Sequence, residues 1–204
     1  MALLFVASNI INAQISDPRV LSEDERLVNG STDVNANYYA GKSTVKGNTI
    51  TFKVVDGKKK YNTNYSLFYL YNENNKMDMS AMPTLKGDVA PITDDTSPYK
   101  DHVVENVVIS CIPEDAMKKF EKCSDTIGVI MFVNSKTGKI DEVTFMLRES
   151  SLKSSEGSIF SLPPQTFENI EKRLKSDVRF SIKPEYREYS FIRLFWDHYV
   201  DLMQ

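Results

Sequence analysis

Basic residues do not outnumber acidic ones in this sequence. Its 25 Lys and Arg and 28 Asp and Glu give a net charge of −3 at pH 7. Proteins that bind nucleic acids through phosphate contacts carry a basic excess, so this balance argues against a nucleic-acid partner. Long apolar runs are also missing, because no segment reaches the roughly 20 residues that a transmembrane helix requires. The sequence therefore predicts no transmembrane segment.

Motifs of known catalytic and metal centres are absent as well. The chain holds two histidines, His102 and His198, and no HExxH, GxSxG or CxxC motif, glycine-rich phosphate loop or EF-hand loop. Two distant histidines and a cysteine lack the short-range spacing of zinc ligands. We therefore predict no metal site and no cofactor, and a non-catalytic protein is favoured over an enzyme.

Cysteine is scarce, since Cys111 and Cys123 are the two in the chain. Residues 113–123 predict a helix, because Pro113 suits a first turn and acidic residues follow it. Such a helix separates its ends by roughly 15 Å, whereas a disulfide needs Cα atoms within about 7 Å. Both thiols are therefore predicted to be reduced.

The N-terminus has the features of an export signal. Residues 3–11 are apolar apart from Ser8 and Asn9, and Ala13 follows them. A short apolar run that leads to a small residue is the pattern that signal peptidase cleaves. We predict cleavage after Ala13 and a periplasmic or secreted protein of a bacterial envelope, without a lipid anchor because no cysteine follows the run. A buried N-terminal strand is the alternative, and no basic residue precedes Arg19.

The rest of the chain has the composition of a folded globule, with 41% hydrophobic and 26% charged residues. Three prolines fall between residues 80 and 100, and proline at that density disfavours both a helix and a central strand. The predicted organisation is a signal peptide at 1–13, an irregular segment at 14–36, a β-rich meander at 37–79, a Pro-rich connector at 80–100 and an α+β domain at 101–204.

Alternation of polar and apolar residues predicts strands in the first half. Tyr38–Tyr39 is expected to begin one strand, and residues 49–55 and 65–71 form two more. Asp56-Gly57 is a typical two-residue hairpin turn. The second strand is therefore expected to turn back at that point.

The second half combines strands with two helices. Helices are predicted at 113–123 and from Pro163 onward, the latter with Phe167, Ile170 and Leu174 on its inner face. Strands are predicted at 103–110, 126–133, 140–147, 178–182 and 189–196, with a Ser-rich loop at 150–161. A helix is the alternative for 189–196. The fold class is α+β: a two-layer sandwich of a mostly antiparallel sheet and two helices, preceded by the small meander.

Gly128–Val133, Thr137–Ile140 and Glu142–Phe145 describe a hairpin with glycine at its turn. This pattern resembles the central hairpin of TonB C-terminal-like modules. The first half, with Tyr38–Lys42 and Tyr65–Tyr69, is similar to uncharacterised secreted proteins of Bacteroides-type bacteria, a domain of unknown function. The resemblance implies export and an α+β architecture, and it supplies no functional residues.

Cys111 is the candidate for catalytic chemistry. It precedes the helix predicted from Pro113, where a helix dipole favours the reactive thiolate. His102 or His198 would then act as the base. The other interpretation is a small buried residue at the end of a strand, because free cysteine is among the most buried residue types.

Aromatic side chains offer a candidate ligand-binding surface. In the strand predicted at 65–71, Tyr65, Tyr69 and Tyr71 share one face with Leu67. Such a face suits a sugar, a peptide or a small ligand, and the alternative is that it belongs to the core.

An acidic cluster lies in and beside the connector. Asp94, Asp95 and Asp101 would offer oxygen ligands to calcium. The spacing of a known calcium loop is absent, so a solvated loop is the favoured interpretation.

The alternating strands and the missing catalytic motifs together favour a non-catalytic binding or interaction protein of the envelope. Its expected mechanism is strand addition, in which an exposed edge strand pairs with an extended segment of a partner. The partner would be a protein or a glycan of the envelope. A thiol-dependent hydrolase using Cys111 and a small-ligand carrier using the tyrosine face are the alternatives.

Overall fold

The structure is a computed structural model of the 204-residue chain. It describes residues 37–58, 65–76, 92, 102–114, 116, 125–149 and 159–199. The predicted signal peptide, the segment predicted to be irregular at 14–36, the acidic cluster and nearly all of the predicted Pro-rich connector lie outside the described residues.

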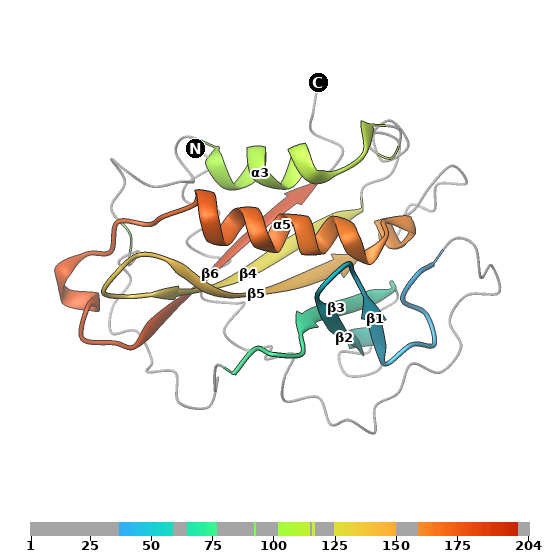
Figure 1. The fold of residues 1–204 in the computed structure, drawn as a ribbon, viewed down its shortest axis with the longest axis horizontal. Helices are drawn as coiled ribbons and strands as arrows, with labels where there is room; N and C mark the ends of the chain where they lie inside the picture. Colours follow the sequence, from blue (N-terminus) through green and yellow to red (C-terminus); the bar gives the residue numbers. More distant parts are fainter. Residues whose placement is uncertain are drawn as a thin grey trace.

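The described strands form one antiparallel sheet of six strands, with the order β1-β2-β3-β5-β4-β6 (Figure 1). Every neighbouring pair is antiparallel, so no crossover between parallel strands is needed. The sheet joins both halves of the sequence, because β3 from the first half pairs with β5 from the second. The strands are β1 (Thr44–Lys46), β2 (Thr51–Asp56), β3 (Leu67–Asn72), β4 (Thr126–Asn134), β5 (Ile140–Arg148) and β6 (Phe191–Tyr199).

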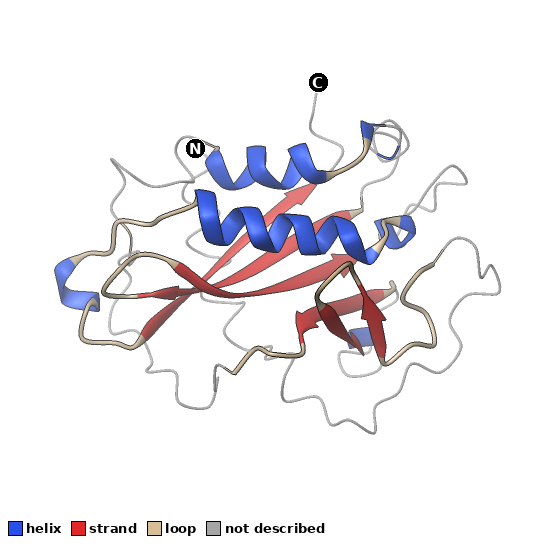
Figure 2. Ribbon diagram, in the orientation of Figure 1, coloured by secondary structure: helices blue, strands red, loops and turns tan. Residues whose placement is uncertain are grey.

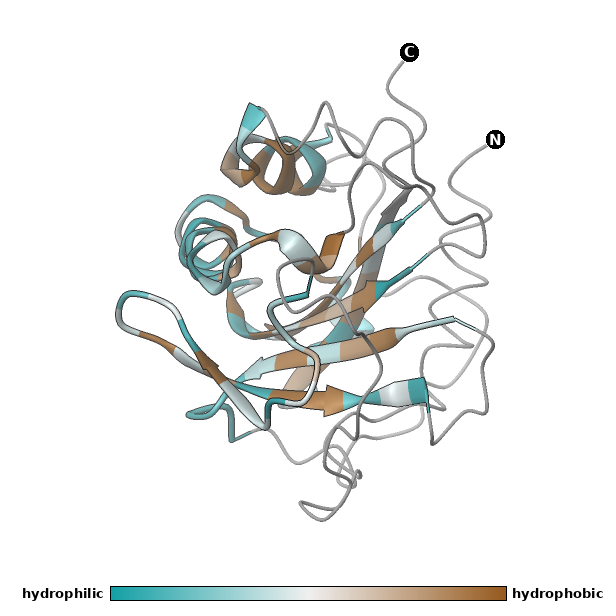
Figure 3. Ribbon diagram, turned by 90° about the vertical axis from the view of Figure 1, so that its right-hand side faces the viewer, coloured by the Kyte–Doolittle hydropathy of each residue, from teal (hydrophilic) through white to brown (hydrophobic). Residues whose placement is uncertain are grey.

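Two helices lie on one face of this sheet (Figure 2), and the view along them in Figure 3 shows both on the same side. They are α3 (Val103–Cys111) and α5 (Pro164–Asp177), and they pack against each other. Short 3₁₀ turns, η4 (Ile159–Ser161) and η5 (Pro184–Tyr186), precede and follow α5. This arrangement confirms the predicted α+β fold of an antiparallel sheet and two helices.

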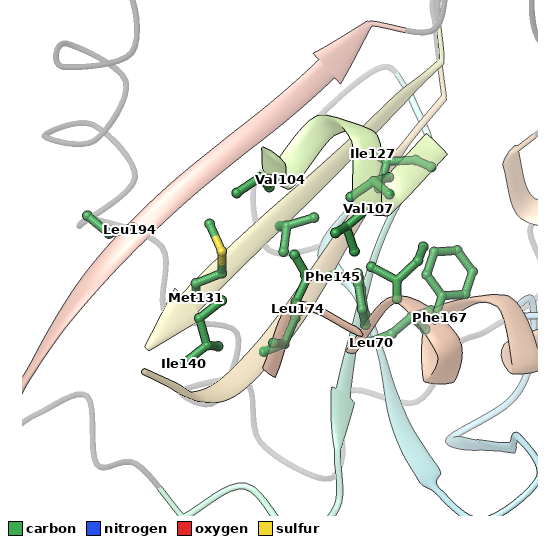
Figure 4. Close-up of a cluster of buried hydrophobic side chains, with 14 of the residues drawn as sticks. Leu70, Val104, Val107, Ile127, Met131, Ile140, Phe145, Phe167, Leu174 and Leu194 are labelled. Carbon is green, nitrogen blue, oxygen red and sulfur yellow. The ribbon is translucent and has the colours of Figure 1, made fainter. Parts of the chain in front are cut away.

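The main core lies between the helices and the sheet (Figure 4). Phe167, Ile170 and Leu174 point inward from α5, as their spacing predicts, and each is 0% exposed. The ring of Phe167 lies 5.1 Å from that of Phe145 on β5 and 6.1 Å from that of Tyr39. A helix that begins with Pro164 at its first position therefore presents one continuous apolar face to the sheet.

The segment Val103–Cys111 is a helix, so the strand predicted at 103–110 is wrong. Its valines and isoleucine suggested a strand because β-branched residues are common there. The buried residues Val104, Val107 and Val108 are spaced three and four positions apart, which is the spacing of one helix face. Packing of this face against α5 and the sheet outweighs the weak local preference.

Residues 178–182 are extended, but the strand predicted there is wrong. Buried and exposed side chains alternate along the segment, as expected of a strand. Its backbone makes isolated bridges instead of a ladder, one from Arg179 to Lys139 and one from Ile182 to Ile92. Alternation therefore reports which side of the segment is buried, and it does not report a pairing partner.

Two local predictions in the first half are also wrong. Tyr38–Tyr39 lies in a bend before β1, where the Tyr38 amide donates to the Phe160 carbonyl at 2.9 Å. Asp56-Gly57 is not a two-residue hairpin turn, because β2 ends at Asp56 and β3 begins only at Leu67. The Asp56 carboxylate accepts from the Lys58 amide at 2.8 Å, a local contact that is typical of turns.

Five other strand predictions are confirmed, with shifts of a few residues: 49–55, 65–71, 126–133, 140–147 and 189–196 correspond to β2 to β6. The helix predicted at 113–123 is described at Glu114 and Ala116, which are helical, and its other residues, with Cys123, lie outside the described part. The Ser-rich loop is described from Ile159, which begins η4.

Replacement of Phe167 by Ala tests the role of the inner face of α5. Removal of this fully buried ring leaves a cavity between Tyr39 and Phe145. We expect the free energy of unfolding, measured by urea titration, to fall by about 3–5 kcal/mol. Asn169→Ala on the exposed side of the same helix is the control and should change it by less than about 0.5 kcal/mol; equal losses in both variants would contradict the assignment.

Candidate functional site

The structure does not bring Cys111 and His102 together. Cys111 is the last residue of α3 and His102 is its N-cap, so at 1.5 Å per residue they lie roughly 13 Å apart. His102 Nδ1 instead lies 2.7 Å from Glu105 Oε2. His198 belongs to β6 and is paired in register with Ile127. Cys111 ends α3, so the dipole of this helix does not favour a thiolate there.

The tyrosine face predicted on residues 65–71 belongs to a second apolar cluster, on the side of the sheet opposite to the helices. Leu67 and Tyr69 are 5% and 3% exposed, and Tyr65 and Tyr71 are half-buried and packed against the cluster. The cluster is completed by Val55, Ile130, Phe132, Phe191 and Phe195. The tyrosines share one face of the strand, as predicted. Because they are buried or half-buried there, this face belongs to the second apolar cluster.

No group of three or more His, Cys, Asp and Glu side chains in the described ranges could hold a metal ion. Asp94, Asp95 and Asp101 lie outside those ranges, so the calcium hypothesis stays a prediction. Among the same residues, no helix is long and apolar enough to cross a membrane.

The buried Glu168 carboxylate accepts several hydrogen bonds and was not among the residues singled out from the sequence. It lies on α5 and is 0% exposed. Its oxygens accept from the backbone amides of Asn48 at 2.5 Å, Thr49 at 3.0 Å and Ile50 at 3.3 Å. It also accepts from Thr49 Oγ1 at 2.7 Å and pairs with Lys172 Nζ at 2.6 Å. One helix side chain thus binds the whole β1–β2 turn.

The environment of Glu168 strongly favours its charged form. Burial by itself raises a carboxyl pKa. Hydrogen bonds from Lys172, from the Thr49 side chain and from the backbone of Thr49 and Ile50 outweigh that effect and lower the pKa of Glu168 from 4.5 to about 2. The carboxylate is therefore ionised at neutral pH and anchors the turn as an anion.

Gly47 leaves the room that this contact needs. A Cβ atom at position 47 would overlap Glu168 Oε2. The Gly47 amide also donates to the Ile50 carbonyl at 2.8 Å, which closes the turn. The close approach of Glu168 explains why a glycine occupies this position of the β1–β2 turn.

A groove of 430 Å³ opens beside this anchored turn, within the roughly 300–1,000 Å³ typical of ligand sites. One wall is the edge strand β1, and the other is the beginning of α5, from Pro163 to Gln165. Tyr38 and Lys42 complete it. Among the described residues, Tyr38 is the large hydrophobic side chain that stays exposed, at 42%.

Tyr39 fixes the two walls of the groove relative to each other. Its ring is fully buried beneath the groove, and its hydroxyl donates to the Leu162 carbonyl at 2.5 Å, just before α5. Burial raises the pKa of Tyr39 well above its usual value, so the hydroxyl keeps its proton. The segment that carries Tyr38 is therefore tied to the start of α5.

The outer edge of β1 offers backbone groups that have no partner among the described residues. The Val54 amide donates to Ser43 and the Gly47 amide to Ile50, and Val45 is in register with Phe52 between them. In an antiparallel pair, hydrogen-bonded residues alternate with residues whose amide and carbonyl point away. The amide and carbonyl groups of Thr44 and Lys46 therefore point outward, toward the groove side of the sheet edge.

The groove is positively charged. Lys42 and Lys46 are exposed, and neither forms an ion pair with a described residue. Lys42 Nζ lies 5.8 Å from the centre of the Tyr38 ring. The first turn of α5 holds no acidic residue, so the positive end of the helix dipole is not offset there.

Comparisons with known proteins show a similar fold but no family. No family model matches the sequence, and no curated protein matches it. The crystal structure of a DUF5043 family protein from Bacteroides uniformis has a similar fold, with a TM-score of 0.61 and 17% identity over 80% of this chain and 88% of that one. At this identity the likeness establishes the fold alone. It agrees with the resemblance to uncharacterised proteins of Bacteroides-type bacteria.

The groove was not predicted from the sequence. Tyr38, Lys42 and Lys46 come from one short segment, but Pro163, Pro164 and Gln165 lie more than a hundred residues away. Glu168 occupies a position next to the inner face of α5, and a charged residue at such a border is the one signal that could have drawn attention to it.

Replacement of Glu168 by Gln tests the anchored turn through its pH dependence. Because the folded-state pKa lies below 4.5, the ionised group stabilises the protein above that pH, and this contribution is lost as the pH falls from 4.5 toward 2. At neutral pH we expect Glu168→Gln to lower the free energy of unfolding by about 3 kcal/mol. The difference from the parent protein should shrink below pH 4.5.

The control is Glu73→Gln, which removes an exposed carboxylate from the turn after β3. Its effect should stay below about 0.5 kcal/mol. A Glu168→Gln difference that is constant across the acidic range would contradict an ionised, hydrogen-bonded anchor.

Proposed function

We propose that this protein is an exported, non-catalytic binding protein of the bacterial cell envelope, and that its partner pairs along the outer edge of β1. The observation that carries the proposal is the groove beside β1, where the backbone groups of Thr44 and Lys46 point outward. Strand addition to an open sheet edge is a common mode of peptide recognition, with backbone hydrogen bonds for affinity and neighbouring pockets for specificity.

The charged and nucleophilic side chains of the described residues also support binding over catalysis. Glu168 is occupied by the β1–β2 turn, and Glu171 accepts from Asn72 Nδ2 at 3.2 Å and Lys175 Nζ at 2.6 Å. Cys111 and His102 lie at opposite ends of α3. The hydrolase alternative would need Cys111 to work with a base other than His102.

Export rests on the N-terminal sequence. The apolar run at 3–11 and the small residue Ala13 fit a signal peptide. The similar fold from Bacteroides uniformis supports a bacterial setting. The hairpin that resembles TonB C-terminal-like modules corresponds to β4 and β5, two interior strands of the sheet. A relationship with those modules is part of the proposal.

Photocrosslinking from the groove tests the binding proposal. A benzophenone amino acid in place of Tyr38 keeps an aromatic ring at an exposed groove position. In cells that export the protein natively, we expect a discrete crosslinked envelope product from position 38. The same probe at Asn106, on the exposed side of α3, is the control and should give none.

Thr44→Pro in the Tyr38-probe protein makes the crosslinking specific to strand addition. The Thr44 amide points away from β2, so proline there leaves the β1–β2 hydrogen bonds in place and blocks the outer edge. Loss of the crosslink is expected, and a crosslink of unchanged yield would contradict binding along β1.

The mature N-terminus tests export. Intact mass and N-terminal peptide analysis of the protein recovered from the envelope fraction should identify Gln14 as the first residue, because cleavage is expected after Ala13. Recovery of the uncleaved chain from the cytoplasmic fraction alone would contradict the proposal.

A further inference from the structure

We infer that the groove beside β1 takes a short, extended, acidic peptide segment, in which acidic residues alternate with apolar ones. This inference rests on the proposed function and specifies the chemistry of its partner. The observations that carry it are the outward backbone groups of Thr44 and Lys46, the exposed Lys42 and Lys46, which form no ion pair with a described residue, and the apolar wall of Tyr38 and Pro163.

The direction of the β1 side chains sets the alternation. Val45 is 7% exposed and belongs to the core under the helices, whereas Thr44 and Lys46 are exposed. Successive side chains of a strand point to opposite faces, and paired residues on adjacent strands share a face. A partner residue opposite Val45 therefore faces the start of α5, and the residues opposite Thr44 and Lys46 face the other side.

The apolar positions of the peptide follow from the wall on the α5 side. The residue opposite Val45 meets Tyr38, Pro163 and Pro164, which line the groove there. Tyr38 offers a flat ring with 42% exposure, and proline rings are rigid and lose little entropy when a ligand covers them. A Val, Ile or aromatic side chain fits this wall.

The acidic positions follow from charge. The Lys46 side chain points to the same face as the partner residues that pair with Thr44 and Lys46. Cross-strand pairs of opposite charge are favourable on that face. Lys42 also lines the groove and adds a second positive charge beside the bound segment. Glu168 does not cancel these charges, because it is fully buried and paired with Lys172.

The same lysines disfavour a second copy of this chain as the occupant. Lysine on a short edge strand is a known device against edge-to-edge pairing. Two β1 edges would bring Lys42 and Lys46 of one copy toward those of the other, and like charges at close range raise the free energy of that pairing. An acidic partner turns this repulsion into attraction.

Binding of two matched peptides tests the inference. The probe is a Ser-Glu-Val-Glu-Val-Glu-Ser amide with fluorescein on its N-terminal amine, and its match, labelled at the same position, carries Lys at each Glu position. Fluorescence anisotropy with the folded protein should show binding of the acidic peptide at least about tenfold tighter than of the basic one. The affinity should fall as salt is raised from about 0.05 to 0.5 M, because exposed charges are screened.

Variants of the protein locate the site. Lys42→Gln combined with Lys46→Gln should weaken binding of the acidic peptide about three- to thirtyfold, in the range that two exposed ion pairs contribute. Lys136→Gln combined with Lys139→Gln is the matched control, since both lysines are exposed at the β4–β5 turn. The control should leave the affinity unchanged. Similar losses in the two double variants would overturn the inference.

A modified peptide tests strand addition without any change to the protein. Methylation of the backbone nitrogens that face β1 removes donors while it keeps every charge. We expect the methylated acidic peptide to lose binding. Unchanged binding of the methylated peptide, tighter binding of an acidic oligosaccharide such as a galacturonate oligomer, or self-association of the protein through β1 would each overturn the inference.

Failure of this inference can be told apart from failure of the proposed function. A Thr44→Pro-sensitive crosslink from position 38 together with no preference for the acidic peptide would keep β1 as the binding edge and reject the acidic partner. Absence of a crosslink from position 38, or a crosslink that Thr44→Pro leaves unchanged, would reject β1 as the binding edge, whichever peptide the protein binds.

Discussion

The contact between Glu168 and the β1–β2 turn is the interaction on which the candidate site depends. β1 has three residues, and so short an edge strand gains little from its own ladder. The turn is instead bound to α5 by a buried carboxylate that accepts three backbone amides and a hydroxyl. Removal of that anion leaves several buried donors unsatisfied, which costs more than the loss of an exposed ion pair. The position of β1 is therefore fixed by its attachment to α5.

One helix serves both parts of the molecule. The inner face of α5, with Phe167 and Ile170, packs on the sheet, and the flank that carries Glu168 and Glu171 reaches β1 and β3. Its first residues form the second wall of the groove. Because the same rigid element sets the core, the turn and the groove wall, the groove is formed before any ligand arrives. Preformed sites lose less entropy on binding than sites that must be ordered first.

The sequence predicted the fold class and most of the sheet, because β4 and β5 are long runs with clear periodicity and α5 has both a proline start and a regular apolar face. It failed at α3, where β-branched residues at helical spacing were taken for a strand. It also failed at 178–182, where alternation was present without a partner strand. The groove was not predictable, since its two walls lie more than a hundred residues apart in the sequence and meet through tertiary contacts, those of Glu168 with the β1–β2 turn and of Tyr39 with Leu162. Cys111 was a candidate because it precedes the helix predicted from Pro113, and the structure places it at the end of α3, with His102 at the other end of the same helix.

Amide hydrogen exchange of β1, measured by NMR with and without the acidic peptide, tests the central claim that this edge is open and binds a strand. In the free protein we expect slow exchange at Val45, which is in a hydrogen-bonded pair with Phe52, and fast exchange at Thr44 and Lys46. Addition of the peptide should slow exchange at Thr44 and Lys46 and leave Val45 unchanged. Slow exchange at Thr44 and Lys46 in the free protein, or no added protection when the peptide is bound, would show that this edge is not an open strand that binds the peptide.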